Sequence, residues 1–287
     1  MQIKSTIIYR EDSTFPDFLR NINDAPLSLY CAGNVNLLDM DCVAVVGARK
    51  CSEYGRQVAL KIGETLAKNN IVTVSGMAEG IDASAHLGAL KAGGKTIAVL
   101  GSGVDVCYPR CNKNLYDKIL REGLIISEYP FGTKPRPFHF PQRNRIISAI
   151  SKAVTVVEAS SGSGSLITAE IAAEQGKEIM AVPGNINSTF SLGCNKLIAD
   201  GASIMTVPED ILRIIGVEPK LQNEEFVEMG EDERKIFNML REEGELSLEY
   251  LCKSLGKEPS IISGLIAVME IKGLVSYQLG KIFIAKF

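Results

Sequence analysis

The segment FPQRNRIISAISKAVTVVEASSGSGSLITAE, residues 140–170, contains a complete strand–loop–helix unit. Two arginines, Arg143 and Arg145, come first, and the apolar run AVTVV at residues 153–157 follows. A loop of glycine and serine then opens a helix. A short strand that is apolar throughout is typical of a parallel sheet buried on both faces. Because a helix start presents free backbone amides, the question is whether this loop performs chemistry on an anionic group or only holds it.

The same pattern recurs through the middle of the chain. Short apolar runs without polar alternation are separated by longer amphipathic segments, such as residues 53–69 and 167–177. Strands and helices that alternate at this spacing indicate βαβ units. The sequence therefore predicts an α/β fold with a doubly wound parallel sheet. Its expected strands are VAVVG (43–47), IVTVS (71–75), TIAVLG (96–101), LIIS (124–127), AVTVV (153–157), EIMAV (178–182) and SIMTV (203–207).

Polar or glycine-rich loops follow four of these expected strands. The carboxyl ends of parallel strands meet at one edge of a sheet, and ligands bind there in open α/β folds. Glycine in any one loop is also explained by a tight turn. Together, however, the loops predict a broad crevice that receives anions. They are GARKCSEYG (47–55), SGMAEGID (75–82), GSGVD (101–105) and SSGSGS (160–165).

None of these loops has the pattern of a common cofactor site. The turn Gly101-Ser102-Gly103 is followed by Val104, Asp105 and Val106, so the third glycine of G-x-G-x-x-G is missing. No Walker A lysine pattern is present either. Seven cysteines lie scattered beside two histidines, a composition that favours reduced structural thiols over a zinc site. We therefore expect neither a cofactor nor a bound metal.

Composition and charge divide the chain into parts. The 46% hydrophobic and 23% charged residues are ordinary for a globular protein, and no apolar run reaches the ~18 residues of a membrane helix. With no signal-peptide core at the N-terminus, we expect a cytoplasmic protein. We predict an N-terminal extension (1–40), a sheet domain (41–216), an acidic linker (217–231) and a small C-terminal domain (232–287). Residues 41–216 carry 19 basic and 16 acidic side chains, whereas residues 217–287 carry 9 and 13.

The C-terminal part is expected to be a winged helix-turn-helix. Three short helical segments precede a terminal hairpin, VSYQLG-KIFIAKF, and such folds commonly read DNA with the third helix. Here that helix, residues 259–272, offers only Lys272 as a basic residue, and the whole unit is acidic. A role in protein contact or regulation is therefore favoured over reading duplex DNA, and the partner is not identified by the sequence.

Six motifs follow one another in a fixed order along the chain. They are VGARKCSEYGRQVA, VSGMAEGIDASAH, GGKTIAVLGSGVDVCYPRCNKNL, ISEYPFGTKPRPFHFPQRNRIISAIS, SGSGSLITAEIAAEQGKEIMAVPG and GCNKLIADGA. This ordered series resembles the DNA-processing protein DprA (Smf) family. The resemblance covers roughly residues 25–206, and the tail is similar to the small winged-helix domain of many members. It implies a Rossmann-like, usually homodimeric protein that binds single-stranded DNA, protects DNA entering the cell and loads the RecA recombinase in natural transformation. No enzymatic turnover is implied.

Candidate DNA-binding residues come from the residue chemistry and from this resemblance. Arg49 matches the family's G-x-R arginine, although it could instead cap its own helix. Phe140 matches a base-contacting position, and either Phe138 or Phe140 is expected to stack on a base. A lysine of some members falls on Pro137, so Lys134 or Arg136 would have to replace it. The full predicted set is Arg49, Arg110, Lys134, Arg136, Phe140, Arg143, Asn144, Arg145, Gly162, Ser163, Gly164 and Ser165.

An enzyme is the main alternative. Residues 143–168 are similar to a stretch of nucleoside-monophosphate phosphoribohydrolases, in which P-G-G-x-G-T-x-x-E ends on the acting glutamate. That position falls on Thr168, which cannot supply a carboxylate, and Glu170 lies on a different helical face. The sequence therefore favours a loop that only holds an anionic group over one that performs chemistry on it.

Other acidic residues and the C-terminal unit leave further alternatives. Asp82 and His86 are expected to form a structural pair or cap rather than a catalytic one. Glu128 and Glu158 are expected to orient arginines. In a third interpretation, a regulator binds duplex DNA mainly through the winged helix.

Overall fold

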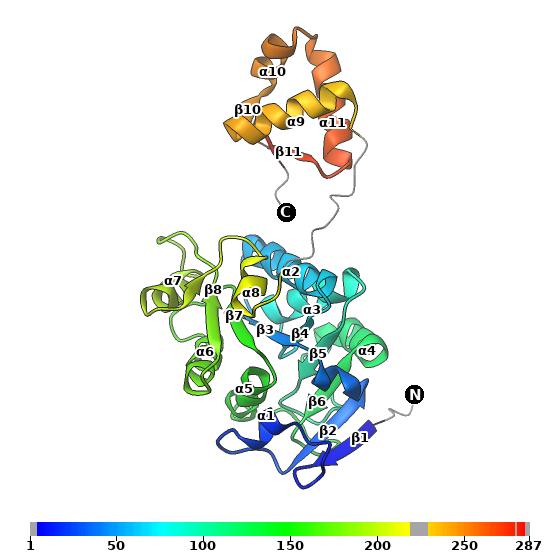
Figure 1. Cartoon of the computed structure of the whole chain (residues 1–287), viewed down its shortest axis with the longest axis vertical. Coiled ribbons are helices and arrows are strands. Elements are labelled where there is room, and N and C mark those ends of the chain that lie inside the picture. Colours follow the sequence, from blue (N-terminus) through cyan, green and yellow to red (C-terminus); the bar gives the residue numbers. More distant parts are fainter. Residues whose placement is uncertain (1–4, 219–228, 279, 285–287) are drawn as a thin grey trace. The chain divides into compact units, whose positions relative to one another are not determined.

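The computed structural model describes residues 5–218, 229–278 and 280–284 (Figure 1). The chain forms two compact units, residues 1–220 and 221–287, which are described separately below. Most of the predicted linker, residues 217–231, lies outside the described residues. Among the described helices, none is both long and apolar enough to cross a membrane.

The first unit is built on one nine-stranded sheet with the order β1-β2-β6-β5-β4-β3-β7-β8-β9. All seven apolar runs predicted as strands are strands, and they run parallel to their neighbours from β6 to β9. The predicted α/β fold with a largely parallel sheet is therefore confirmed. The strands are β1 (Ser5–Tyr9), β2 (Ser28–Gly33), β3 (Cys42–Val46), β4 (Val72–Ser75), β5 (Thr96–Val99), β6 (Leu124–Ser127), β7 (Ala153–Val156), β8 (Glu178–Ala181) and β9 (Ser203–Ile204).

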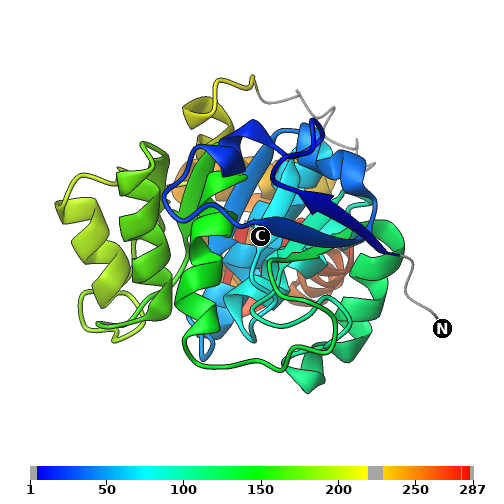
Figure 2. The same cartoon turned by 90° about the horizontal axis from the view of Figure 1, so that it is seen from below.

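Helices cover both faces of this sheet (Figures 1 and 2). Ala44 and Val46 of β3 point to the core under α1, α5, α6 and α7, and Val43 and Val45 point to the core under α2, α3 and α8. Because both faces are buried, the central strands are apolar at every position. The helices are α1 (Asp17–Arg20), α2 (Glu53–Lys68), α3 (Ile81–Lys91), α4 (Lys113–Glu122), α5 (His139–Ala149), α6 (Gly164–Glu174), α7 (Leu192–Ala199) and α8 (Asp210–Ile214), with 3-10 turns η1 (Val35–Asp39) and η2 (Arg110–Asn112).

The direction of winding reverses between β3 and β7. From β3 the chain proceeds through β4, β5 and β6 on one side, then returns to β7 and continues through β8 and β9 on the other. Loops that leave the carboxyl ends of such neighbouring strands diverge to opposite faces and leave a crevice. The two loops touch at their base, where the Ala48 amide donates to the Glu158 carbonyl at 2.8 Å. The crevice expected from the loop pattern therefore opens above β3 and β7.

Residues 1–40, expected as a separate extension, contribute the two antiparallel strands at one edge of the sheet. Leu29 and Cys31 of β2 are fully buried beside half-buried Ser28 and Tyr30, and Tyr9 of β1 is exposed. This partial alternation reflects uneven burial near the edge of the sheet, where β1 is the outermost strand. It lacks the continuous apolar run that identified the other strands.

The second unit has its own core, which includes Ile236, Leu240, Leu251 and Ile266. Three helices and a terminal hairpin are present as expected, and a short third strand, β10, joins the hairpin. Whether this unit acts as a winged helix-turn-helix stays a prediction. Its elements are α9 (Glu231–Glu243), β10 (Glu245–Ser247), α10 (Leu248–Leu255), α11 (Pro259–Ile271), β11 (Val275–Gln278) and β12 (Lys281–Ile284).

Candidate functional site

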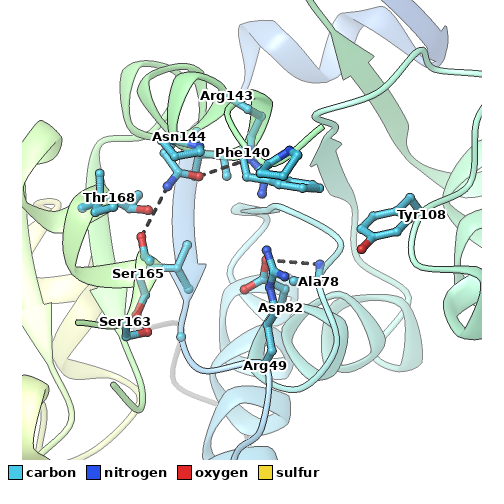
Figure 3. Close-up of a pocket in the computed structure, with 17 residues that line it drawn as sticks. Arg49, Ala78, Asp82, Tyr108, Phe140, Arg143, Asn144, Ser163, Ser165 and Thr168 are labelled. Atoms are coloured by element: carbon cyan, nitrogen blue, oxygen red, sulfur yellow. Dashed lines mark hydrogen bonds between the residues drawn. The ribbon is translucent and has the colours of Figure 1, made fainter. Parts of the chain in front are cut away.

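A cavity of about 510 Å³ lies at the carboxyl ends of β3, β4 and β7. Its walls come from the loops after these strands, from the loop after β5, and from α5 and the start of α6. In Figure 3, Ser163 and Ser165 lie on one side and Tyr108 on the other, with Arg49 and Phe140 between them. This crevice is the place where the sheet topology predicts a ligand.

Arg49 is an exposed cation stacked on an aromatic ring. Its guanidinium carbon lies 5.2 Å from the centroid of Phe140, whose ring lies 5.7 Å from that of Tyr108. In the part of the chain that the structure describes, Arg49 takes part in no ion pair and does not cap a helix. Its guanidinium edge is therefore available to an anion, while its face is held by Phe140.

The start of α6 provides the opposite wall of the crevice. Ser163 is the N-cap residue, and its hydroxyl lies 2.9 Å from that of Ser165. The first amides of a helix have no intrahelical acceptor, so they attract an anion together with the helix dipole. Ser163, Gly164 and Ser165 line the crevice, whereas Gly162 does not. Gly162 has a φ of 81°, which makes it the residue that turns the chain into the helix.

Arg143, predicted to follow a nucleic-acid backbone, lines the crevice but is buried. Only 5% of it is exposed, and its Nη1 donates to the carbonyl of Gly76 at 2.7 Å and to that of Val99. Its Nε donates to Asn144 Oδ1 at 3.2 Å. Burial lowers the pKa of Arg143 to about 10, and the Asp82 carboxylate opposes this shift. Arg143 thus joins the ends of β4 and β5 and forms part of the crevice wall.

Asp82 and His86 do not pair with each other, and the alternative expectation of a structural cap fits Asp82. Asp82 Oδ2 accepts from the amides of Gly76 at 3.1 Å and Ala78 at 3.3 Å, so it caps the loop before α3. Burial raises the pKa of Asp82, although Arg143 and these amides oppose the shift. His86 is fully buried with its Nδ1 2.5 Å from Thr96 Oγ1. Burial lowers the pKa of His86 to about 3.

Arg145 lies outside the crevice, and its predicted contact with DNA stays a prediction. It forms a two-pronged ion pair with Glu128, at 2.8 Å from Nη1 to Oε1 and 2.7 Å from Nη2 to Oε2. Its Nη1 also donates to the Gln142 carbonyl and its Nε to that of Asp24. The expectation that Glu128 orients an arginine is confirmed. Arg145 borders a separate groove of about 940 Å³, and most of its N–H donors are already used.

The remaining predicted residues divide between the crevice and its surroundings. Asn144 lines the crevice and donates from Nδ2 to the Gly164 carbonyl at 3.4 Å. Lys134, Arg136 and Arg110 are exposed but do not line the cavity. The Arg136 guanidinium lies 6.0 Å from the centroid of Phe138, a ring that is 55% exposed and outside the crevice.

Sequence reasoning missed Tyr108 as a crevice residue. It lies in the loop after β5, in the stretch CYPRC, where an aromatic residue next to proline follows a glycine turn. An exposed aromatic in a strand-end loop is the signal that would have found it. In the described residues, no three histidine, cysteine, aspartate or glutamate side chains lie together to hold a metal.

A family model and individual relatives both match most of the chain. Residues 6–216 match the family model described as DNA recombination-mediator protein A. The chain is 48% identical over 201 residues to DNA processing protein DprA from Streptococcus pneumoniae, covering 70% of this chain and 71% of that protein. It is 40% identical over 215 residues to Protein Smf from Synechocystis sp., covering 74% of this chain and 54% of that protein.

Solved structures of related proteins share the fold of the first unit. The X-ray structure of the Streptococcus pneumoniae DprA matches with a TM-score of 0.70 and 46% identity, over 74% of each chain. A structure that addresses the single-stranded DNA binding mode of DNA processing protein A from Helicobacter pylori matches with a TM-score of 0.68 and 31% identity. It covers 74% of this chain and 95% of that one.

Proposed function

This chain belongs to the DNA recombination-mediator protein A family, and we propose that it binds single-stranded DNA in the crevice above β3 and β7 as a recombination mediator. In the finer form of the proposal it protects incoming DNA and loads the RecA recombinase in natural transformation, acting as a homodimer. RecA loading, the homodimer and a cytoplasmic location rest on the family resemblance and the sequence. DNA binding is also supported by the residues of the crevice.

One observation carries the proposal: the exposed Arg49 guanidinium stacks on Phe140 in a crevice that also contains the start of α6. Arginine binds a phosphate through two parallel N–H groups, and helix-start amides bind a second anionic oxygen or a neighbouring phosphate. Phe140 and Tyr108 offer faces for stacking of a base. The crevice therefore combines the two chemistries that a nucleotide chain requires.

The same combination favours single strands over duplex DNA. A base has to leave its stack to reach Phe140, which is half-buried within the crevice. In duplex DNA that step costs unpairing and unstacking energy, whereas a single strand supplies unpaired bases. Stacking and phosphate contacts are independent of base identity, as binding to DNA of any sequence requires.

A phosphoribohydrolase-like enzyme remains the alternative use of the crevice. Among the described residues that line it, Asp82 is the one carboxylate, and it is occupied by two backbone amides and faces Arg143. Thr168, at the position of the acting glutamate, also lines the crevice. Release of adenine from AMP by the wild-type chain, abolished in Asp82→Asn, would favour the enzyme.

The proposal is tested by fluorescence anisotropy with labelled single- and double-stranded oligonucleotides over a salt series. We expect a preference for single strands. The logarithm of the binding constant should fall with the logarithm of the salt concentration, with a slope of about −0.7 for each phosphate that the protein neutralises. Arg49→Glu should weaken single-strand binding by roughly tenfold or more, since a charge-assisted contact is replaced by repulsion. Arg121→Glu is the matched control, because Arg121 is an exposed arginine on α4 outside the crevice.

Two outcomes would contradict the proposal. Tight duplex binding that is indifferent to Arg49 would move the DNA site out of the crevice. Absence of binding to either oligonucleotide would exclude DNA as the ligand. Free nucleotides would then be the ligands to test for the crevice.

A further inference from the structure

We propose that Glu158 is the positioning residue of the crevice, fixing the loop that carries Arg49; this inference rests on the proposed function of that loop. Glu158 follows β7 and is 4% exposed. It contacts the Arg49 loop at two points, one through its backbone and one through its carboxylate. The residues between these points, Arg49, Lys50 and Cys51, are thereby held at both ends.

The carboxylate holds the far end of the loop at the start of α2. Ser52, the N-cap residue of this helix, donates its amide to Glu158 Oε2 at 2.8 Å and its hydroxyl to Oε1 at 2.5 Å. The same Ser52 hydroxyl accepts from the Gly55 amide at 3.0 Å. A carboxylate at this place also interacts favourably with the dipole at the N-terminus of α2.

The backbone of Glu158 holds the near end of the loop. Its carbonyl accepts from the Ala48 amide at 2.8 Å, one residue before Arg49. The Ala48 carbonyl in turn accepts from the Ile81 amide at 3.3 Å, which connects the loop to α3. The loops after β7, β3 and β4 are therefore linked in series, with Arg49 on the middle one.

The glycines around Glu158 show how closely the parts approach. A Cβ on Gly55 would lie 2.5 Å from the Glu158 carboxylate, and a Cβ on Gly47 would lie 3.0 Å from its carbonyl oxygen. The first turn of α2 thus rests directly on the carboxylate. This contact explains the glycine at position 55, which the start of a helix does not otherwise require.

The contacts also exclude Glu158 as the acid that the enzyme alternative lacks. Both of its oxygens accept hydrogen bonds from Ser52, and it does not line the cavity. In the described residues no ion pair joins Glu158 to an arginine, so the expectation that it orients one stays a prediction. It acts on Arg49 through the backbone of the loop and through Ser52.

Hydrogen–deuterium exchange and DNA binding, measured on the full chain, test this inference separately. Without DNA, Glu158→Gln should speed exchange in a peptide spanning residues 47–55, because a neutral amide holds Ser52 less firmly. Ser52→Ala should do the same with little disturbance of the core. The matched control is Asp210→Asn, which loosens a similar carboxylate clamp at the start of α8, where Asp210 accepts from Thr206 and Val207.

With single-stranded DNA, Glu158→Gln should weaken binding by roughly tenfold, within the range for residues coupled in one network. In an Arg49→Ala background the same change should have little further effect, whereas a general loss of stability would weaken binding equally in both. Equal losses in both backgrounds, or unchanged exchange of residues 47–55, would overturn the positioning role. Faster exchange in a chain that binds no DNA would leave the clamp standing and overturn the proposed function instead.

Discussion

At the scale of single residues, three arginines with similar sequence surroundings have three different roles. Arg49 is exposed in the crevice, Arg143 is buried against backbone carbonyls, and Arg145 is paired with Glu128. The sequence predicted Arg49 because it follows a strand end in the family's G-x-R position. It could not separate the other two, because their acceptors at Gly76, Val99 and Glu128 are distant in the chain. Whether a cation is free depends on these long-range contacts.

The two phenylalanines of the KPRPFHFPQRNR segment are expected to differ in the same way. Phe140→Ala should weaken single-strand binding by about 1–3 kcal/mol, the range for loss of one stacked base, and should also remove the ring that holds Arg49. Phe138→Ala should have a much smaller effect, because Phe138 lies outside the crevice. Anisotropy titration of both variants measures the difference. Equal losses would place the stacking surface on the outer loop.

At the scale of elements, the sequence predicted the seven parallel strands and the loops at their carboxyl ends. Fully buried strands are apolar at every position, and that pattern is local. The strands β1, at the edge of the sheet, and β2, next to it, were missed because their burial is one-sided and depends on the pairing of β2 with β6. The start of α6 was predicted as an anion site from SSGSGS alone. That Tyr108 joins this site from another loop required the fold.

The role of the α6 start can be separated from its stability by one substitution. Ser163→Asp keeps a good N-cap residue and adds a negative charge, so the stability of the first unit should be unchanged or slightly raised. DNA binding should fall, because the new carboxylate repels the phosphate. Ser247→Asp is the matched control, an N-cap serine at the start of α10 in the second unit. Thermal unfolding and anisotropy are measured on both variants. Unchanged binding by Ser163→Asp would remove the α6 start from the site.

At the scale of the whole molecule, the two units differ in how their basic side chains are paired. In the second unit Lys235, Lys257, Lys272 and Lys281 each pair with an acidic residue. Lys272, the one basic residue of the third predicted helix, pairs with the largely buried Glu233 at 2.7 Å. The pairing of Lys272 favours the predicted role in protein contact over DNA reading by the third helix. The acidic balance of this unit can be counted from the sequence, whereas its ion pairs require the structure.

Burial of His86 has a consequence for the stability of the first unit. Its pKa is about 3 in the folded protein and about 6.5 when unfolded, so the folded state excludes a proton that the unfolded state binds. The contribution of the neutral His86 to the free energy of unfolding is therefore fully present above pH 6.5 and is lost as the pH falls toward 3. The slope approaches about 1.4 kcal/mol per pH unit. Urea unfolding at pH 5 and pH 7.5 should show a smaller pH difference for His86→Gln than for wild type. An equal difference would contradict a neutral buried His86.

The central claim, that single-stranded DNA occupies the crevice above β3 and β7, is tested most directly by photo-crosslinking. A single-stranded oligonucleotide carrying 5-iodouracil is irradiated with the full chain, and the attached peptides are identified by mass spectrometry. We expect attachment at Phe140 or Tyr108, the aromatic residues of the crevice, and its loss in Arg49→Glu. Attachment mainly at α11 of the second unit, or at any surface outside the crevice, would contradict the account.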